Sequence, residues 1–491
     1  MKKLPIGTSD FKSLREDDKY FVDKSMFIKE IIDEDAEVVL LPRPRRFGKT
    51  LNLSMLRWFF EVSENKEKRK KLFSGLNIEK DAAFEEHFAK YPVICLSFKD
   101  VRNMDFESAA QKIKALIGKE FARHNYLFES EVLNETEKKD FKNIMSREAD
   151  MAVYENGLSE LSRYLHKYHN QKPILLIDEY DTPIHAAFQY GYYEESISFF
   201  KGFLGAGLKD NPDIFKGVIT GILRIAKESI FSGLNNLGVY TLLSAKFSDK
   251  FGLTQAEVKR LLTDFSHEDK LEQVKAWYDG YAFGENKLYN PWSIINYTAN
   301  TKDGFRPYWV NTSSNEILRD LIKEGPPVIK QEFSDILKDI PIVKRLDDNI
   351  VLRDLIKNDI SLYSFLVFSG YLKAFDCTTD EEDNMFYKLL VPNKEIKRIF
   401  KDTILKWINE SFENHELQIM LKALVTGDIK LFEKLLSKFV LETLSYFDTE
   451  NKNVERVYQA FILGMLVNLG GEYEVDSEKE SGYGRYDISI I

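Results

Sequence analysis

A loop with the sequence RPRRFGKT, between an apolar run and a helical pattern, constrains the fold of this chain more than any other stretch. The apolar run, residues 36–41, predicts a short buried strand, and residues 51–61 have apolar side chains at helical spacing. Between them, Gly48, Lys49 and Thr50 match the end of a phosphate-binding loop, whose pattern is Gly, four residues, then Gly-Lys-Ser/Thr. In such a loop Lys49 neutralises the β- and γ-phosphates of a nucleotide, and the Thr50 hydroxyl binds Mg²⁺.

The beginning of the loop departs from this pattern. The position where the first glycine is expected holds Arg43, and the following Pro44 biases the backbone of Arg43 toward an extended shape. One interpretation is a basic turn before a helix, with no ligand. The other is that Arg43, Arg45 and Arg46 add positive charge where a triphosphate would lie.

Three further apolar runs have the composition of buried strands, at residues 91–98, 173–178 and 215–223. Stretches with helical spacing separate them, such as residues 107–124. Apolar strands that alternate with helices imply a parallel sheet with helices on both faces. We therefore expect an α/β domain of the P-loop NTPase class, in which this sheet holds the loop.

The run at residues 173–178 ends in Asp178, and Glu179 follows it directly, in the sequence PILLIDEYD. P-loop proteins hold Mg²⁺ with an Asp at the end of a buried strand, and Asp178 fits this position if its strand lies beside the loop strand. Glu179 would then polarise an attacking water as a general base. The alternative is a strand that ends in two acidic surface residues, but the order of loop and acidic pair along the chain favours a metal site.

The last apolar run continues into the sequence GVITGILRIAKESIFSGLNN. Thr220 stands near the end of the expected strand and Arg224 follows four residues later. We expect Thr220 to sense the γ-phosphate by a hydrogen bond and Arg224 to sense its charge. The competing interpretation is a polar strand end with a surface arginine, and spacing alone favours it.

The sequence changes character from about Leu253. Thr254 and Glu257 form a capping-box pattern before a periodic apolar face, and the tract from there to about Asn451 has mostly helical spacing. Residues 278–293, YDGYAFGENKLYNPWS, interrupt it as a turn-rich stretch. A further helix is expected at residues 454–470, and two strands follow it.

Composition excludes several classes of protein. The net charge of −10 means that a nucleic-acid surface would have to be a local patch. The two cysteines, Cys95 and Cys377, form no CxxC pair, which excludes a zinc knuckle and argues against a disulfide framework. No run approaches the roughly 18 apolar residues of a membrane span, and no signal peptide follows the basic start. We therefore expect a cytoplasmic protein without a membrane partner.

Several stretches together resemble the bacterial AAA-ATPase-like proteins that carry a C-terminal PD-(D/E)XK nuclease-like domain. They are FVDKSMFIKEII, RPRRFGKTLNLSML, ILLIDEYDTPI, TGILRIAKESIFSGLNN, LYNPWSIINY and FSGYLK. The run RPRRFGKT is highly specific to that family, whose loop also lacks the first glycine. The resemblance covers nearly the whole chain, and it implies a P-loop fold that binds ATP and Mg²⁺ through Lys49, Thr50, Asp178 and Glu179.

The family's C-terminal domain resembles a restriction-endonuclease fold, which gathers an acidic residue on a helix, an Asp at a strand end and then Glu-x-Lys. Glu455 matches the first position and Asp487 the second, as a vestigial nuclease site. The Glu-x-Lys is missing because the sequence ends at Ile491, and we expect Lys479 to face solvent in a charged turn. Nuclease activity is therefore not expected of residues 1–491.

Four parts follow from this reading: an AAA-like P-loop ATPase domain (residues 1–250), a helical lid (251–330), a helical linker region (331–430) and a partial nuclease-like domain (431–491). The first hypothesis for function is a slow Mg²⁺-dependent ATPase that acts as a switch coupled to the nuclease-like domain, with DNA as a partner of that domain. The second is a scaffold that binds nucleotide without hydrolysis for a protein partner. A plain nuclease is disfavoured, and the oligomeric state stays open, with a homo-oligomer among the options.

Overall fold

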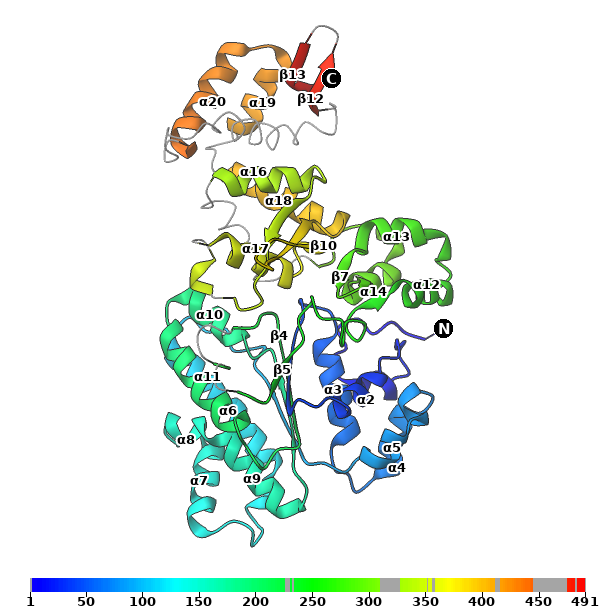
Figure 1. The fold of residues 1–491 in the computed structure, drawn as a ribbon, viewed down its shortest axis with the longest axis vertical. Helices are drawn as coiled ribbons and strands as arrows, with labels where there is room; N and C mark the ends of the chain where they lie inside the picture. The colour runs from blue at the N-terminus through cyan, green and yellow to red at the C-terminus, as the bar shows by residue number, and fades with distance from the viewer. Residues whose placement is uncertain are drawn as a thin grey trace. The chain divides into compact units, whose positions relative to one another are not determined.

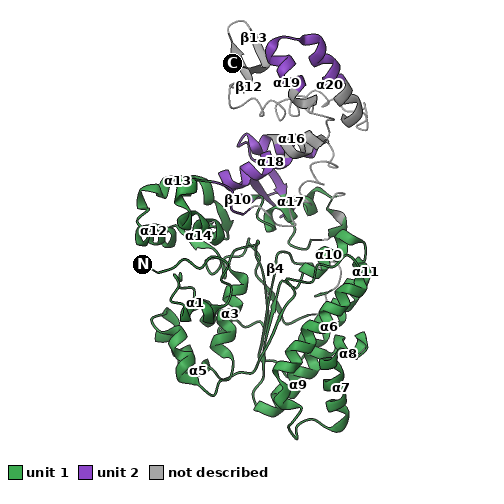
Figure 2. Cartoon of the chain, turned by 180° about the vertical axis from the view of Figure 1, so that it is seen from behind, with its two compact units in different colours: residues 1–305, 345–372 green, residues 306–344, 373–491 purple. Residues whose placement is uncertain are grey.

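The computed structural model describes residues 2–225, 230–231, 234–309, 327–350, 352–355, 358–410, 416–444, 475–481 and 484–490. The chain divides into two compact units, Met1–Phe305 with Arg345–Leu372, and Arg306–Lys344 with Lys373–Ile491 (Figure 2). These limits do not coincide with residues 250, 330 and 430, where the sequence predicts domain boundaries, and that four-part division remains a prediction.

Unit 1 is built on a five-stranded sheet in which all neighbouring strands are parallel. Its strands are β1 (Val38–Pro42), β2 (Val93–Ser97), β3 (Ile174–Asp178), β4 (Lys216–Gly221) and β5 (Leu237–Val239). All residues of β1, β3 and β4 are buried, as expected for strands that are covered on both faces. The predicted parallel α/β sheet is confirmed, and β5 adds a strand that the sequence pattern did not predict.

The order of the strands corrects one expectation. The sheet runs β2-β3-β4-β1-β5, so β4 lies between the loop strand β1 and the strand that ends in Asp178. Chain order predicts that two strands share a sheet, but it does not fix which of them are neighbours. Because all strands are parallel, the carboxyl ends of β1, β3 and β4 still meet at one edge of the sheet, where Pro42 pairs with Gly221.

Helices cover both faces of this sheet. Figure 1 shows α1 to α5 on one side of it and α6 to α11 on the other. They are α1 (Phe11–Glu16), α2 (Met26–Ile32), α3 (Lys49–Phe60), α4 (Lys66–Lys70), α5 (Ala82–His87), α6 (Phe106–Arg123), α7 (Glu135–Ser146), α8 (Met151–Glu155), α9 (Gly157–His169), α10 (Thr182–Tyr190) and α11 (Tyr193–Leu208). In α6, for example, Ile113, Ile117 and Phe121 are buried at intervals of one turn, as an amphipathic helix against a sheet requires.

A small lid follows the sheet, within unit 1. It contains β6 (Leu253–Thr254), α12 (Gln255–Asp264), α13 (Leu271–Tyr278), β7 (Tyr281–Phe283), β8 (Asn286–Tyr289) and α14 (Pro291–Ala299). The predicted capping box of Thr254 and Glu257 is present at the start of α12.

The lid contains strands as well as helices, whereas the sequence predicted a mostly helical tract interrupted by a turn-rich stretch. The turn-rich stretch forms a hairpin of β7 and β8, and β6 pairs with β8 to complete a three-stranded antiparallel sheet. Gly284 lies at the hairpin turn with φ +53°, a conformation that favours glycine. Strands this short show too little alternation to stand out from a helical background.

Unit 1 also includes the segment Arg345–Leu372. We call it the returning segment because the chain leaves unit 1 after Phe305 and returns to it at Arg345. Its helix α17 (Asp359–Phe368) buries every residue from Leu362 to Phe368. A helix that is apolar on all sides belongs in a core.

Unit 2 mixes helices and strands. It contains α16 (Pro327–Leu337), β9 (Ile342–Arg345, whose last residue belongs to unit 1), β10 (Lys373–Thr379), β11 (Met385–Leu390), α18 (Lys394–Glu410), α19 (Glu416–Thr426), α20 (Ile429–Leu444), β12 (Val475–Ser481) and β13 (Gly484–Ile490). The expected helical linker therefore also holds a sheet in the order β10-β11-β9. Within the described ranges, no helix is both long and apolar enough to span a membrane.

The predicted vestigial nuclease residues lie at the end of unit 2. Glu455 and the helix expected at residues 454–470 are outside the described residues. Asp487 lies in β13, which pairs with β12 as an antiparallel hairpin, so the two expected strands are present. Lys479 lies in β12 opposite Tyr486, and not in a turn as expected. A restriction-endonuclease-like fold for this part remains a prediction.

Candidate nucleotide site

The loop between β1 and α3 ends as a phosphate-binding loop does. Gly48 is the N-cap of α3 with φ +87°, and Arg46 also has a positive φ of 66°. The N-cap residue Gly48 has no side chain that could accept from the first backbone N–H groups of the helix. These N–H groups and the positive end of the helix dipole make the turn suitable for an anion.

Lys49 lies in the centre of the loop. Its side chain is buried, and Nζ donates to the carbonyl oxygens of Arg43 at 2.9 Å and Pro44 at 3.0 Å. Burial lowers the pKa of Lys49, and the carboxylates of Glu179 and Asp178, which raise it, only partly offset this effect. The ammonium group is therefore held by two loop carbonyls, and its charge interacts with those of Glu179 and Asp178.

A cluster of oxygen atoms joins three strands and the first turn of α3. The Asp178 carboxylate accepts hydrogen bonds from the hydroxyl groups of Thr50 and Thr220, each at 2.7 Å, and the Ser97 hydroxyl lies 3.4 Å away. Carboxylate and hydroxyl oxygens are ligands that Mg²⁺ accepts beside phosphate and water. The donor set of Thr50 and Asp178 therefore fits the predicted metal site.

The structure gives Thr220 a contact that the sequence did not predict. It is fully buried, and its hydroxyl donates to the second carboxylate oxygen of Asp178. This bond orients the Asp178 side chain. Direct contact of Thr220 with a γ-phosphate remains a prediction.

Glu179 follows Asp178 in an unusual conformation, with φ +51°. Non-glycine residues in this region are uncommon and are found preferentially at functional sites. Its carboxylate accepts a hydrogen bond from the Thr182 hydroxyl at 3.1 Å and lies 3.9 Å from the Arg102 guanidinium. Arg102, in the loop after β2, was missed by the sequence analysis because no motif surrounds it.

Arg43 does not face the phosphate position. It is fully buried, and its guanidinium donates to the carbonyl oxygens of Pro42 at 2.8 Å, Tyr240 at 2.6 Å and Phe247 at 3.2 Å. Two aromatic rings, Phe251 and Phe283, lie within cation–π distance of it, at 5.1 and 5.6 Å.

The environment of Arg43 contains no carboxylate partner among the residues that the structure describes. Burial lowers its pKa to about 9, so the group still holds its proton at neutral pH. The arginine in place of the first loop glycine is thus a structural residue that ties β1 to the chain leading into the lid. The expectation that Arg43 adds charge at a triphosphate is wrong, because its side chain points into the protein.

The other two loop arginines differ from Arg43 and from each other. The Arg46 guanidinium stacks on the ring of Trp292 in α14, with 4.4 Å between charge and ring centre. Arg45 is partly exposed. Burial and the positive charge of Arg102 lower its pKa, whereas the negative charge of Glu179 raises it. The charge of Arg45 therefore interacts with those of Glu179 and Asp181.

Asp181, in the same DEYD sequence, is a positioning residue that the sequence analysis did not single out. It is fully buried and accepts hydrogen bonds from the backbone N–H groups of Ile222 at 2.7 Å and Leu223 at 3.0 Å. Burial raises its pKa, but His185 and these N–H groups outweigh burial, and the pKa is lowered overall. Asp181 thus fixes the turn after β4, which leads to Arg224. The sequence feature that could have identified Asp181 is its place as the second Asp of the DEYD motif.

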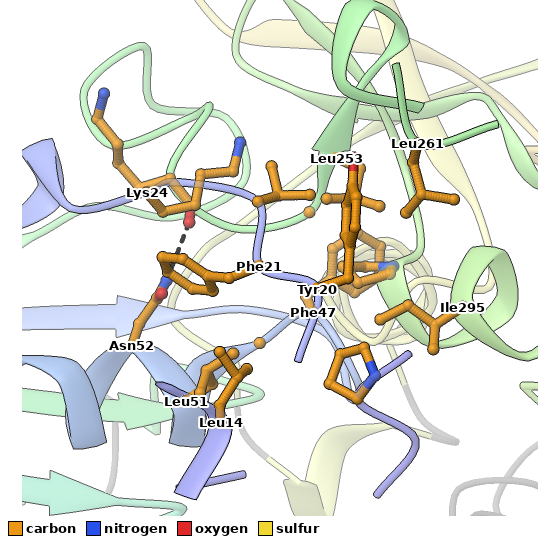
Figure 3. Close-up of a pocket in the computed structure, with 16 residues that line it drawn as sticks. Leu14, Tyr20, Phe21, Lys24, Phe47, Leu51, Asn52, Leu253, Leu261 and Ile295 are labelled. Carbon is orange, nitrogen blue, oxygen red and sulfur yellow. Dashed lines mark hydrogen bonds between the residues drawn. The ribbon is translucent and has the colours of Figure 1, made fainter. Parts of the chain in front are cut away.

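A mostly apolar pocket opens beside the start of α3, and Figure 3 shows the side chains around it. It holds an empty volume of about 570 Å³, part of it open to solvent. Its lining comes from the N-terminal segment, the loop with α3, and the lid: Pro5, Leu14, Tyr20, Phe21, Val22, Lys24, Phe47, Gly48, Leu51, Asn52, Lys250, Gly252, Leu253, Leu261, Pro291 and Ile295.

Hydrogen bonds tie the three walls of this pocket together. Asn52 of α3 donates to the Lys250 carbonyl at 2.9 Å, a bond drawn in Figure 3. Lys24 of the N-terminal segment pairs with Glu257 of the lid at 2.7 Å, and the Tyr20 hydroxyl donates to Asp264 at 2.7 Å. The pocket is therefore a built part of unit 1, next to the phosphate loop.

We predict that restoring the usual glycine, Arg43→Gly, destabilises the protein. The change leaves a cavity between two aromatic rings and removes the donor to buried carbonyls, which together cost about 3–5 kcal/mol of unfolding free energy. Chemical denaturation measures this. The control is Arg102→Gly, which removes a half-exposed arginine and should cost less than about 1 kcal/mol. Equal losses for the two variants would contradict a structural role of Arg43.

Comparison with known proteins agrees with this geometry. Residues 5–231 match the model of a family described as "Predicted AAA-ATPase". The chain is 25% identical, over 496 aligned residues, to an "Uncharacterized protein in vnfD 5'region" of Azotobacter chroococcum mcd 1, covering 100% of this chain and 87% of that protein. No solved structure matches the chain. The matched residues include β1 to β4, the loop RPRRFGKT and the acidic sequence DEYD, so residues 5–231 are similar to an AAA-ATPase-like domain.

Proposed function

We propose that unit 1 binds Mg²⁺ and ATP at the carboxyl edge of its sheet and hydrolyses the nucleotide slowly. The observation that supports this most strongly is the 2.7 Å hydrogen bond between Thr50 and Asp178, which brings together two motifs 128 residues apart. The match of residues 5–231 to an ATPase family model supports the same reading.

Each part of the triphosphate has a candidate partner in this proposal. Lys49 and the first N–H groups of α3 bind the β- and γ-phosphates, as a cation and a helix N-terminus bind anions. Thr50 and Asp178 hold Mg²⁺, whose charge neutralises the phosphate oxygens during transfer. Arg45 adds a second positive charge beside the acidic pair.

The base of the nucleotide has a candidate position in the apolar pocket. Gly48 and Leu51 line both the pocket and the start of α3, so a ligand with its phosphates in the loop has its base within reach of the pocket. Binding pockets for small molecules are typically concave and mostly apolar. We propose that the pocket receives the adenine of ATP, with Leu51, Leu261 and Ile295 as apolar walls.

Hydrolysis requires a residue that polarises the attacking water. Glu179 is the candidate base that polarises water, and its strained backbone supports a functional role. However, its carboxylate is engaged by Thr182 and lies near Arg102. This observation favours the second candidate, a scaffold that binds ATP without turnover. For an active switch, the sequence predicts coupling to the nuclease-like C-terminal part.

We predict that Ile295→Trp blocks the base but not the phosphates. An indole in place of the Ile295 side chain fills part of the pocket and takes up space that the base would occupy. Affinity for Mg²⁺–ATP should fall by about tenfold or more, or about 1.4 kcal/mol, whereas affinity for inorganic triphosphate should stay the same. Isothermal titration calorimetry measures both, and Ile295→Val is the control that keeps the pocket apolar and open. Unchanged ATP affinity in Ile295→Trp would place the base elsewhere.

We predict that Glu179→Gln keeps ATP binding and loses turnover. The amide keeps the size and hydrogen-bonding capacity of the side chain but cannot act as a base, so the rate should fall by roughly 10²–10⁴-fold. Phosphate release under single-turnover conditions measures the rate, and Glu195→Gln, on the exposed start of α11, controls for the loss of one charge. If the wild type itself releases no phosphate, with or without DNA, the scaffold is the correct function.

A further inference from the structure

The returning segment Arg345–Leu372 packs directly on the phosphate loop. A Cβ atom built on Gly370 would lie 3.1 Å from Cβ of Pro44, and Gly370 has φ +90°. Both facts require glycine at this position, because a side chain would be strained and would press on the loop. The segment begins more than a hundred residues after the end of the family match, yet it borders the site.

The beginning of the same segment contacts Arg224. Asp348 Oδ2 lies 3.4 Å from a terminal guanidinium nitrogen (NH1) of Arg224, and the backbone N–H of Ile350 donates to the Arg224 carbonyl at 3.3 Å. The turn that presents Asp348 is fixed by α17, since the Ser364 hydroxyl accepts from the N–H of Asp347 at 2.8 Å. The side chain and the backbone of Arg224 are thus both held by this segment.

Arg224 stands where the carboxyl edge of the sheet meets the loop. It follows β4 by three residues, and the carbonyl of Gly221, the last residue of β4, accepts from the N–H of Arg43 at 2.9 Å. Asp181 fixes the intervening turn through Ile222 and Leu223.

One N–H donor of the Arg224 guanidinium is unpaired in the described structure. Its Nε is buried and has no hydrogen-bond partner within the residues that the structure describes, while NH1 faces Asp348. An arginine presents Nε and one terminal nitrogen as a fork that matches two oxygens of a phosphate. A carboxylate on the opposite terminal nitrogen can hold this fork in a fixed direction.

We propose that Asp348 is a positioning residue that orients Arg224 toward the terminal phosphate of ATP. This inference rests on the proposed ATP site and adds a residue far outside the matched domain. Arg224 distinguishes ATP from ADP, because only ATP has a γ-phosphate for its fork. Asp348 contributes through Arg224 and does not itself contact the nucleotide.

The test is the ratio of ADP to ATPγS dissociation constants in the full chain, by calorimetry with Mg²⁺. In Asp348→Asn we expect affinity for ATPγS to fall about 3- to 10-fold, within the range for coupled neighbours, with affinity for ADP unchanged. In Arg224→Gln we expect a loss of about 10-fold for ATPγS alone. The double variant should equal Arg224→Gln, since Asp348 acts only through Arg224.

Asp347→Asn is the matched control, because it removes the same charge from the same turn and the described side-chain hydrogen bonds of Asp347 are with Asn349 and not with Arg224. It should leave the ratio unchanged. A variant that is partly unfolded loses affinity for both nucleotides equally, so the ratio separates positioning from stability. A wild-type ratio in Asp348→Asn would overturn this inference alone. No binding of ATPγS or ADP by the wild type would overturn the proposed function, and this inference with it.

Discussion

The Asp178 carboxylate is the point on which the organisation of unit 1 depends. Thr50 reaches it from the first turn of α3 and Thr220 from the neighbouring strand β4, each through a 2.7 Å hydrogen bond. A buried carboxylate is stable only when it is paired or hydrogen-bonded, so these contacts hold the end of β3 against the end of β4 and the start of α3. The same atoms form the oxygen cluster that fits Mg²⁺. In the proposed function, the contacts that stabilise the edge of the sheet also prepare it for a nucleotide.

Arg43 gives the unusual loop its second anchor. A glycine at this position lets a phosphate loop turn freely, whereas here a buried guanidinium ties the loop to Tyr240 and Phe247. Arg46 on Trp292 adds a contact to the lid, and Gly370 on Pro44 adds one to the returning segment. Contacts with distant parts of the chain thus fix the conformation of this loop, which has Arg43 where the first glycine is expected. This arrangement explains how RPRRFGKT can form a phosphate site without the standard pattern.

The contiguous features of the site were predictable from the sequence, and the distant ones were not. Gly48, Lys49 and Thr50 stand in one motif, and the strand before them and the helix after them are local patterns. The contacts of Arg43 lie 197 and 204 residues away, and the partner of Arg224 lies 124 residues away, so no spacing could indicate them. The lateral place of β4 was missed for the same reason. The strands of the lid are too short to show a period.

The most direct test of the account is the affinity for Mg²⁺–ATP of the wild type and of Lys49→Ala, measured by calorimetry. Lys49 lies in the loop that we assign to the phosphates, and its described hydrogen bonds go to carbonyl groups of that loop. The account predicts that the wild type binds and that the variant binds more weakly by about 1.5–3 kcal/mol, the value of a hydrogen bond to a charged group. Equal affinities, or no binding by the wild type, would contradict it.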